Sequence, residues 1–99
     1  MEFIIEYKVR ADKTDEAGAL RERFFEALRR DADSGLRYRS LSRPDGVSFV
    51  HLAWFADQAA FDRFQSRPHF KDFSSQLPGL CEAGPDASPI TERHAVGIS

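Results

Sequence analysis

The sequence predicts a ferredoxin-like α+β fold, in which an antiparallel four-stranded sheet carries helices on one face. Segments with strand and helix character follow one another as strand, helix, strand, strand, helix, strand along 99 residues. Residues 47–55 are apolar at both parities of a strand, so both faces of the sheet need to be covered. The helical segments can cover only one face. We therefore expect a homodimer, in which a second copy of the chain covers the other face.

The first expected strand spans residues 2–10 and places its apolar side chains on one face: Phe3, Ile5, Tyr7 and Val9. A helix follows, with Thr14 as its expected N-cap. Its buried stripe recurs at helical spacing: Ala17, Leu20, Phe24, Ala27 and Leu28. Gly35 lies just past the end of this helix, where a left-handed cap favours glycine.

Residues 36–43 and 47–55 form the expected second and third strands, joined as a hairpin by the turn Pro44-Asp45-Gly46. Alternation along the third strand places five side chains on one face: Val47, Phe49, His51, Ala53 and Phe55. The opposite face receives three: Val50, Leu52 and Trp54.

Asp57 is the expected N-cap of a second helical region, whose apolar residues are Ala60, Phe61 and Phe64. Pro68 suits the first turn of a separate short helix that Pro78-Gly79 ends, with an apolar side made by Phe70, Phe73 and Leu77. Residues 79–89 contain two Gly and two Pro and predict a surface loop. Residues 90–98 predict the final strand.

Composition predicts one domain over residues 1–99, with nine Phe to anchor its core. The net charge of −2, with acids and bases interspersed, argues against nucleic acid or an anionic membrane as partner. No secretory signal and no apolar run of about 20 residues is present. The single cysteine, Cys81, excludes an internal disulfide and favours a cytoplasmic protein.

The segment from Phe55 to Phe73 resembles the antibiotic biosynthesis monooxygenase-like domains. The matching positions are an aromatic strand end, an acid two residues later, an Ala-aromatic pair and a Pro-His-Phe run: Phe55, Asp57, Ala60, Phe61, Pro68, His69 and Phe70. This resemblance implies a homodimer whose two sheets face each other, a dimeric α+β barrel. Some members are cofactor-independent oxygenases of electron-rich aromatic or quinol substrates, others degrade haem, and many have no established activity.

The chain departs from the family pattern at several positions. Phe64 stands where the family often has His, and Arg67 where it often has Ser. Members of the haem-degrading branch of the family this chain resembles carry an Asn, a Trp and a His. This chain has no Asn, and Phe55 and Ser74 fall at the positions of the Trp and the His. Because that His would be the axial ligand of iron, the departures argue against haem degradation.

His51 is the leading catalytic candidate. A histidine among aromatic side chains could take a proton from a phenolic substrate, leaving an electron-rich anion that can donate an electron to oxygen. Tyr38 could orient the substrate hydroxyl, and Phe49 and Phe55 could hold a planar ring. The alternative is a half-buried strand histidine, hydrogen-bonded to a neighbour or lying in the dimer interface.

His69 is a second catalytic candidate, although packing in the first turn of a helix explains it equally well. Glu6 and Phe73 complete the expected substrate site, with a rim ion pair and ordinary core packing as their alternatives. No metal is expected, because the three histidines, His51, His69 and His94, show no metal-motif spacing. We expect no cofactor, and nothing near Cys81 in the sequence would activate its thiol.

RNA binding is a rival, because residues 46–52 resemble the third-strand motif of RNA-recognition domains. Asp45 replaces the basic residue of that motif, and Phe49 alone remains to stack on a base. The sequence therefore favours a cofactor-independent monooxygenase-like protein that acts on a small aromatic or quinol substrate. The alternative is a non-enzymatic dimeric module that binds a small ligand or has a structural role.

Overall fold

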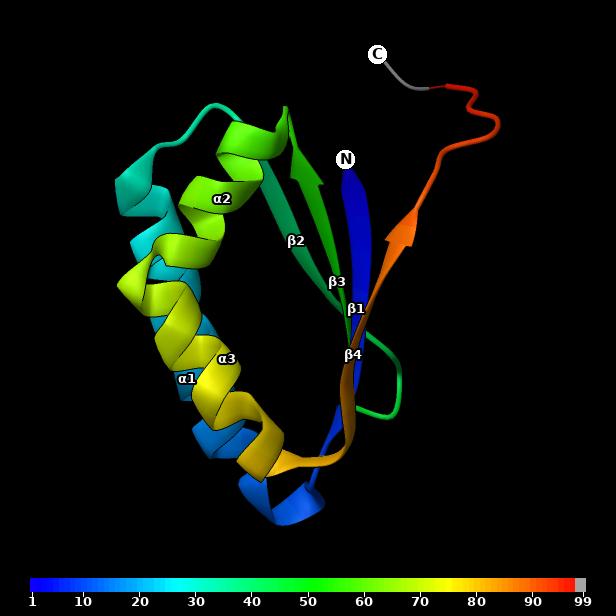
Figure 1. Cartoon of the computed structure of the whole chain (residues 1–99). Coiled ribbons are helices and arrows are strands. Elements are labelled where there is room, and N and C mark those ends of the chain that lie inside the picture. The colour runs from blue at the N-terminus through cyan, green and yellow to red at the C-terminus, as the bar shows by residue number, and fades with distance from the viewer. Residues whose placement is uncertain (98–99) are drawn as a thin grey trace.

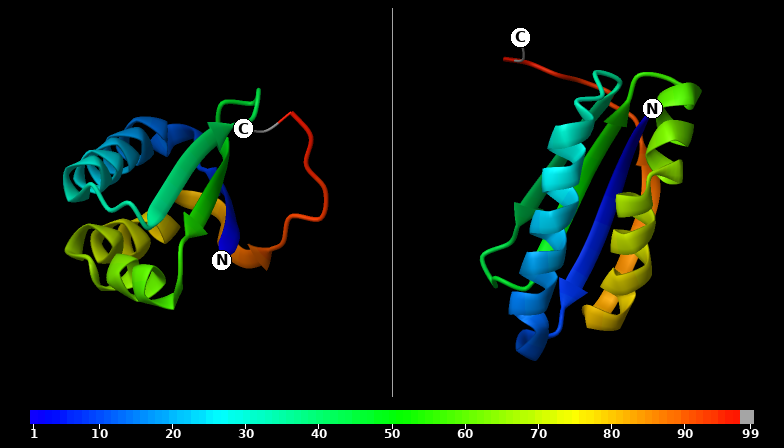
Figure 2. Two further views of the ribbon diagram at one scale, coloured as in Figure 1. Left: turned by 90° about the horizontal axis from the view of Figure 1, so that it is seen from above. Right: turned by 90° about the vertical axis from the view of Figure 1, so that its left-hand side faces the viewer.

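The computed structural model describes residues 1–97 and contains four strands, three α-helices and a short 3₁₀ turn at Ala11–Lys13. In chain order these are β1 (Glu2–Val9), α1 (Thr14–Asp31), β2 (Leu36–Ser42), β3 (Ser48–Phe55), α2 (Gln58–Ser66), α3 (Pro68–Leu80) and β4 (Cys81–Ile90). The strands form one antiparallel sheet in the order β2-β3-β1-β4. All three helices lie on the same face of this sheet (Figures 1 and 2), which confirms the predicted α+β architecture.

The core lies between the sheet and the helices. The largest of its fully buried side chains are Val9, Phe24, His51, Phe55 and Leu77. Four of these five are apolar, and the predicted stripe of α1 is buried as expected, from Ala17 to Leu28. A histidine with no exposed surface in such a core needs hydrogen-bond partners, because an unpaired buried polar group is costly.

The register of the sheet brings tyrosines from both neighbouring strands toward His51. His51 pairs with Ile5 of β1 and with Ser40 of β2. Tyr7 and Tyr38 are therefore its diagonal neighbours on the same face, within reach of long side chains. Central position and parity in the sheet thus create a polar cluster inside an aromatic core.

The last strand is β4, Cys81–Ile90, so the predicted loop at 79–89 and the predicted strand at 90–98 are both wrong. Residues 91–97 form neither helix nor strand, and Ile98 lies outside the described residues. Residues 81–90 contain glycine and proline, which predict a loop. They form a strand because they pair with the free edge of β1. Proline is tolerated there because β4 is itself an edge strand.

Gly84 allows β4 to follow β1 through an irregular stretch of pairing. The register shifts between Glu6 and Lys8, on either side of Tyr7. Gly84 has a φ of +75°, and a Cβ at this position would lie 2.6 Å from the carbonyl oxygen of Glu6. Only glycine fits both the left-handed backbone and the close approach.

The ends of the helices correct three further expectations. Thr14 is the first residue of α1 and makes no capping bond, since the 3₁₀ turn leads directly into the helix. The left-handed residue after α1 is Ala32 and not Gly35, and α3 continues through Pro78-Gly79 to Leu80. The Asp57 cap of α2 is confirmed, since its carboxylate accepts a hydrogen bond from the amide of Ala60 at 2.8 Å.

Among residues 1–97, no helix lies against the face of the sheet opposite α1, α2 and α3, and the exposed segment after β4 stands off on that side (Figure 2). We call this face the outer face, and its apolar members are Ile4, Leu41, Val50, Leu52 and Trp54, all partly or well exposed. Charged side chains flank it, including the Arg43–Glu6 pair at 3.6 Å. Among residues 1–97, no helix has the length and apolar character that crossing a bilayer requires.

Candidate functional site

His51 is held by a tyrosine on each side. Its Nε2 atom lies 2.9 Å from the hydroxyl of Tyr7, and its Nδ1 atom lies 3.2 Å from the hydroxyl of Tyr38. The Tyr7 hydroxyl also accepts a hydrogen bond from Nη1 of Arg21 at 3.2 Å. Strands β1, β2 and β3 and helix α1 therefore each contribute one member to a continuous chain of hydrogen bonds, which we call the relay: Arg21, Tyr7, His51 and Tyr38.

Aromatic rings enclose the imidazole of His51. Phe73 of α3 stacks on it at 5.9 Å between ring centroids, and Phe25 of α1 meets it edge-on at 6.0 Å. Burial, together with the positive charge of Arg21, lowers the pKa of His51 from 6.5 to about 4. The imidazole is therefore neutral at pH 7, with one nitrogen protonated and the other an acceptor.

Both tyrosine hydroxyls keep their protons at neutral pH. Burial raises the pKa of Tyr38 well above its ordinary value of 10.0, and the nearby Tyr7 raises it further. Burial also raises the pKa of Tyr7, although the charge and hydrogen bond of Arg21 act in the opposite direction. The relay is thus built from neutral groups with a single cation at one end.

Arg21 is anchored over the ring of Phe49. Its guanidinium carbon lies 3.9 Å from the ring centroid, and Phe49 in turn stacks on Tyr7 at 5.4 Å. The sequence reasoning missed both Tyr7 and Arg21 as site residues. The available signals were the parity of Tyr7 on the first strand and an arginine four residues after Ala17 on the buried side of the first helix.

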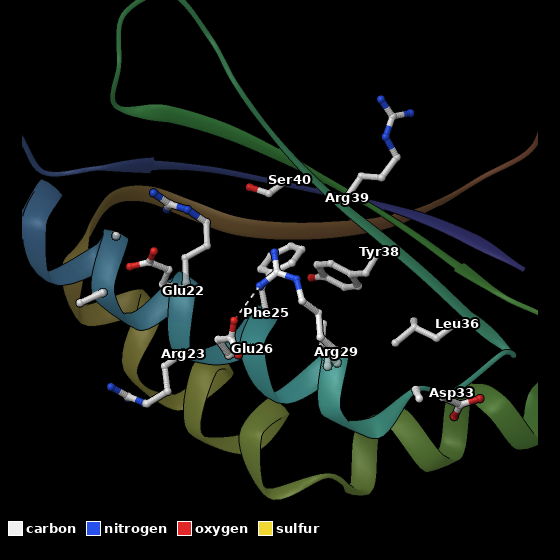
Figure 3. Close-up of a pocket in the computed structure, with 15 residues that line it drawn as sticks. Glu22, Arg23, Phe25, Glu26, Arg29, Asp33, Leu36, Tyr38, Arg39 and Ser40 are labelled. Carbon is white, nitrogen blue, oxygen red and sulfur yellow. Dashed lines mark hydrogen bonds and ion pairs between the residues drawn. The ribbon is translucent and has the colours of Figure 1, made fainter.

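An open groove of about 1200 Å³ lies between α1 and β2 and reaches the Tyr38 end of the relay. Figure 3 shows Tyr38 extending from β2 toward Phe25 of α1, while Arg39 points away from that helix. The rim of this groove is charged: Arg21, Glu22, Arg23, Glu26, Arg29, Asp33 and Arg39. Charge gathers there because the exposed side of α1 forms one wall.

Four predicted site residues come together in the structure: His51, Tyr38, Phe49 and Phe73. Phe55, four residues after His51, lies in the same core but packs against the rings of α2. Its ring meets Phe61 at 5.1 Å and Phe64 at 5.2 Å, and only 2% of its surface is exposed. This surrounding is that of a core residue.

The structure places Glu6 and His69 away from the relay. Glu6 is exposed on the outer-face side of β1, and beside it lies a small hollow of about 190 Å³ that also borders Tyr7 and Phe49. Nε2 of His69 lies 2.7 Å from a carboxylate oxygen of Asp31, which Arg67 approaches at 3.5 Å. His69 thus ties the start of α3 to the end of α1.

Across residues 1–97, no three side chains of His, Cys, Asp or Glu gather where they could hold a metal ion. Cys81 is buried at the start of β4, and burial raises the pKa of its thiol. The chemistry available at the site is therefore hydrogen bonding and proton transfer by the relay, next to the positive charge of Arg21.

Together the fold and the relay define a ferredoxin-like α+β domain with a polar hydrogen-bond network inside an aromatic core. The family model described as antibiotic biosynthesis monooxygenase matches residues 2–76. The chain belongs to this family. No functionally curated protein matches the sequence significantly.

Solved structures with the same fold include proteins from several organisms. SnoaB of Streptomyces nogalater, described as a cofactor-independent oxygenase, is 22% identical with a TM-score of 0.77, and the match covers 98% of this chain and 96% of SnoaB. Rv0793 of Mycobacterium tuberculosis is also 22% identical with a TM-score of 0.77, over 94% and 97% of the two chains. A structure described as an antibiotic biosynthesis monooxygenase reaches a TM-score of 0.81 at 15% identity, over 94% and 98%.

Proposed function

We propose that the protein is a cofactor-independent monooxygenase that oxidises a small aromatic or quinol substrate. The observation that carries this proposal is a neutral histidine fixed between two tyrosine hydroxyls, one of which belongs to a residue that lines an open groove. Membership of the antibiotic biosynthesis monooxygenase family and the fold shared with SnoaB support it.

In the proposed reaction, a planar phenol lies in the groove with its hydroxyl at Tyr38. His51 has no exposed surface, so it acts on the substrate through Tyr38 and not by direct contact. Loss of the phenolic proton leaves an electron-rich anion that donates an electron to oxygen. With a ring C–H para to the hydroxyl, the phenol and O₂ then give a quinone and water: the C–H and O–H bonds break, a second C=O forms, and the substrate supplies all four electrons that reduce O₂.

Oxygen uptake with a panel of hydroquinones and related phenols tests this proposal. We expect turnover by the unaltered protein, and its loss in His51→Phe while light scattering shows an unchanged assembly. His94→Phe is the matched control, because His94 is exposed outside the helices and strands. Unchanged turnover in His51→Phe would remove the relay from the mechanism, and absence of turnover with every substrate would contradict the proposed activity.

A non-enzymatic module that binds a small ligand is the second candidate. The observation in its favour is the complete burial of His51, both of whose ring nitrogens already have partners. Such a network can serve to fix the core packing alone. Saturable binding of phenols without any oxygen uptake would support this candidate over the oxygenase.

We also propose that the protein is a homodimer in which two outer faces pack against each other. The support is the apolar outer face, which none of the helices in the described residues 1–97 covers, together with family membership. Light scattering at micromolar concentration tests this directly. A well-folded, strictly monomeric species would contradict the dimer.

A further inference from the structure

The relay has a direction, and Arg21 sets it. A guanidinium can only donate hydrogen bonds, so the Tyr7 hydroxyl is an acceptor toward Arg21 at 3.2 Å. The Tyr7 hydroxyl must then place its own proton elsewhere. Tyr7 is only 4% exposed, and among residues 1–97 the other partner of its hydroxyl is Nε2 of His51.

The position of the Tyr7 proton determines the tautomer of His51. If Tyr7 donates to Nε2, the single proton of the neutral imidazole is on Nδ1, which donates to the Tyr38 hydroxyl. The opposite tautomer would leave the Tyr7 proton buried without an acceptor, which is costly. The low pKa of His51, about 4, keeps the ring in the neutral form on which this reasoning depends.

The Tyr38 hydroxyl is then the open end of the relay. It accepts a hydrogen bond from His51, and its own proton has no acceptor among residues 1–97. Tyr38 is half-buried and lines the groove, so a molecule bound there can reach this proton. Hydrogen bonds run from Arg21 through Tyr7 and His51 to Tyr38, and each donor strengthens the next along such a chain.

We propose that the groove binds aromatic ligands through an anionic oxygen, a phenolate or enolate, that accepts the hydrogen bond of Tyr38. This deepens the proposed function and rests on it for the identity of the substrate class. The relay stabilises the ionised substrate because its hydrogen bonds leave the Tyr38 hydroxyl free to donate to the substrate oxygen. The proton that the phenol loses passes to solvent through the open groove. Tyr7 and Arg21 are positioning residues, because they act through His51 and Tyr38.

The charges around Tyr38 fit this assignment. From α1 the groove receives Arg21, Glu22, Arg23, Glu26 and Arg29, with Asp33 and Arg39 from the following loop and β2. Arg29 pairs with Glu26, Arg23 pairs with Asp72, and Asp33 pairs with Arg63. Within residues 1–97 the guanidinium of Arg21 has no carboxylate in ion-pair range, so its charge remains available to an anion.

The first test concerns the free protein and needs no ligand. Nitrogen-15 NMR of histidine-labelled protein, assigned by comparison with His51→Phe, reports which ring nitrogen of His51 carries the proton. We expect protonated Nδ1 and unprotonated Nε2 at pH 7. The reverse tautomer would overturn the proposal, because Tyr38 would then donate to His51 and offer no proton to a ligand.

The second test uses 4-nitrophenol, whose ionised form is distinguished by its absorption. We expect bound 4-nitrophenol to ionise at lower pH than in water, with phenolate binding about tenfold tighter than neutral phenol. Tyr38→Phe should abolish this preference and Arg21→Gln should reduce it. Arg30→Gln, the matched control on the exposed side of the same helix and outside the groove lining, should leave it within about twofold because an exposed charge away from the ligand is screened by solvent.

Equal or tighter binding of the neutral phenol, no binding at millimolar concentration, or an equal loss in Arg21→Gln and Arg30→Gln would each overturn the proposal. Neither test involves oxygen. Nitrophenolate binding without oxygen uptake from any hydroquinone would therefore contradict the oxygenase and leave this assignment standing. Turnover of quinols by a protein with the reverse His51 tautomer would support the oxygenase and contradict this assignment.

Discussion

The two faces of the sheet are built from the same strands and differ in what covers them. On the helix side, β3 contributes Phe49, His51 and Phe55 to a closed aromatic core. On the outer face the alternating residues Val50, Leu52 and Trp54 are only partly buried. Alternation alone therefore places a polar relay and an uncovered apolar surface on opposite sides of one strand.

The comparison shows that the polar side chains in this core are hydrogen-bonded to one another. His51, Tyr7 and Tyr38 satisfy one another, and no buried side-chain nitrogen or oxygen among residues 1–97 lacks a partner. The outer face needs no such matching, because its charged side chains remain in water. Removing one member of the relay leaves a buried neighbour without one of its partners, whereas removing the outer-face charge of Glu6 leaves its partner, Arg43, exposed to water.

The largest expected effect comes from adjacent residues that point to opposite faces. Phe55→Ala should lower the free energy of unfolding by about 4 kcal/mol, because it leaves a cavity in the aromatic core. Trp54→Ala should cost about 1–2 kcal/mol, since its ring is already partly exposed. Urea unfolding at one fixed protein concentration measures both. An equal or larger loss in Trp54→Ala would show that the outer face is as tightly packed as the core.

The pH dependence of stability should come mainly from the inner face. The folded protein holds the pKa of His51 at about 4, below its ordinary value of 6.5, so the unfolded chain binds this proton more readily. The stabilisation is complete above pH 6.5 and is lost as the pH falls toward 4, by about 3 kcal/mol. Urea unfolding between pH 7 and pH 4 measures this loss.

Two variants isolate the contribution of His51. His51→Gln should be less stable at pH 7 but should lose most of the decline between pH 7 and pH 4. His94→Gln should keep the decline, because His94 is exposed. Asp33 and Asp72, whose pKa values are lowered by Arg63 and Arg23, lose their partners only below pH 4. A decline that persists in His51→Gln would contradict a neutral, buried imidazole.

A charge introduced on the outer face tests whether this face forms the dimer interface. Leu52→Arg should raise the dissociation constant of the proposed dimer by about a hundredfold, because an unpaired guanidinium would be buried between two sheets. Gln65→Arg, on the exposed side of α2, is the matched control and should not change it. Light scattering across a dilution series gives both constants. Identical behaviour of the two variants would place the interface elsewhere.

Helical periodicity and strand alternation in the sequence were sufficient to predict the elements whose apolar residues follow them. The apolar stripe of α1 is buried as predicted, as are Ala60 and Phe64 of α2 and Ala53 and Phe55 of β3, because burial follows from spacing along each element. Phe49 and Phe61, predicted on the same faces, are partly buried. β4 was missed because its residues have low strand propensity and gain order only by pairing with β1. A pairing between residues 2 and 90 leaves no trace in local sequence.

The site was predictable only in part for the same reason. Parity correctly placed His51 on the face of Phe49 and Phe55, but the partners of His51 depend on sheet register. Tyr7 lies 44 residues from His51 in the sequence, and Arg21 reaches the relay from a different element. His69 looked similar to His51 as a lone histidine, yet its partner, Asp31, lies at the end of α1.

The smallest expected effect separates two stacked arginines, one on each face of the sheet. Arg37 lies over the ring of Trp54 on the outer face, with its guanidinium carbon 4.8 Å from the ring centroid. Arg37→Gln should cost about 0.5–1 kcal/mol of unfolding free energy in the monomer, as an exposed cation–π contact does. Arg21→Gln should cost more, because it also removes the hydrogen bond to Tyr7. Urea unfolding of the two variants in the Leu52→Arg background measures both without a contribution from assembly, and a smaller loss in Arg21→Gln would mean that its charge does little for the relay.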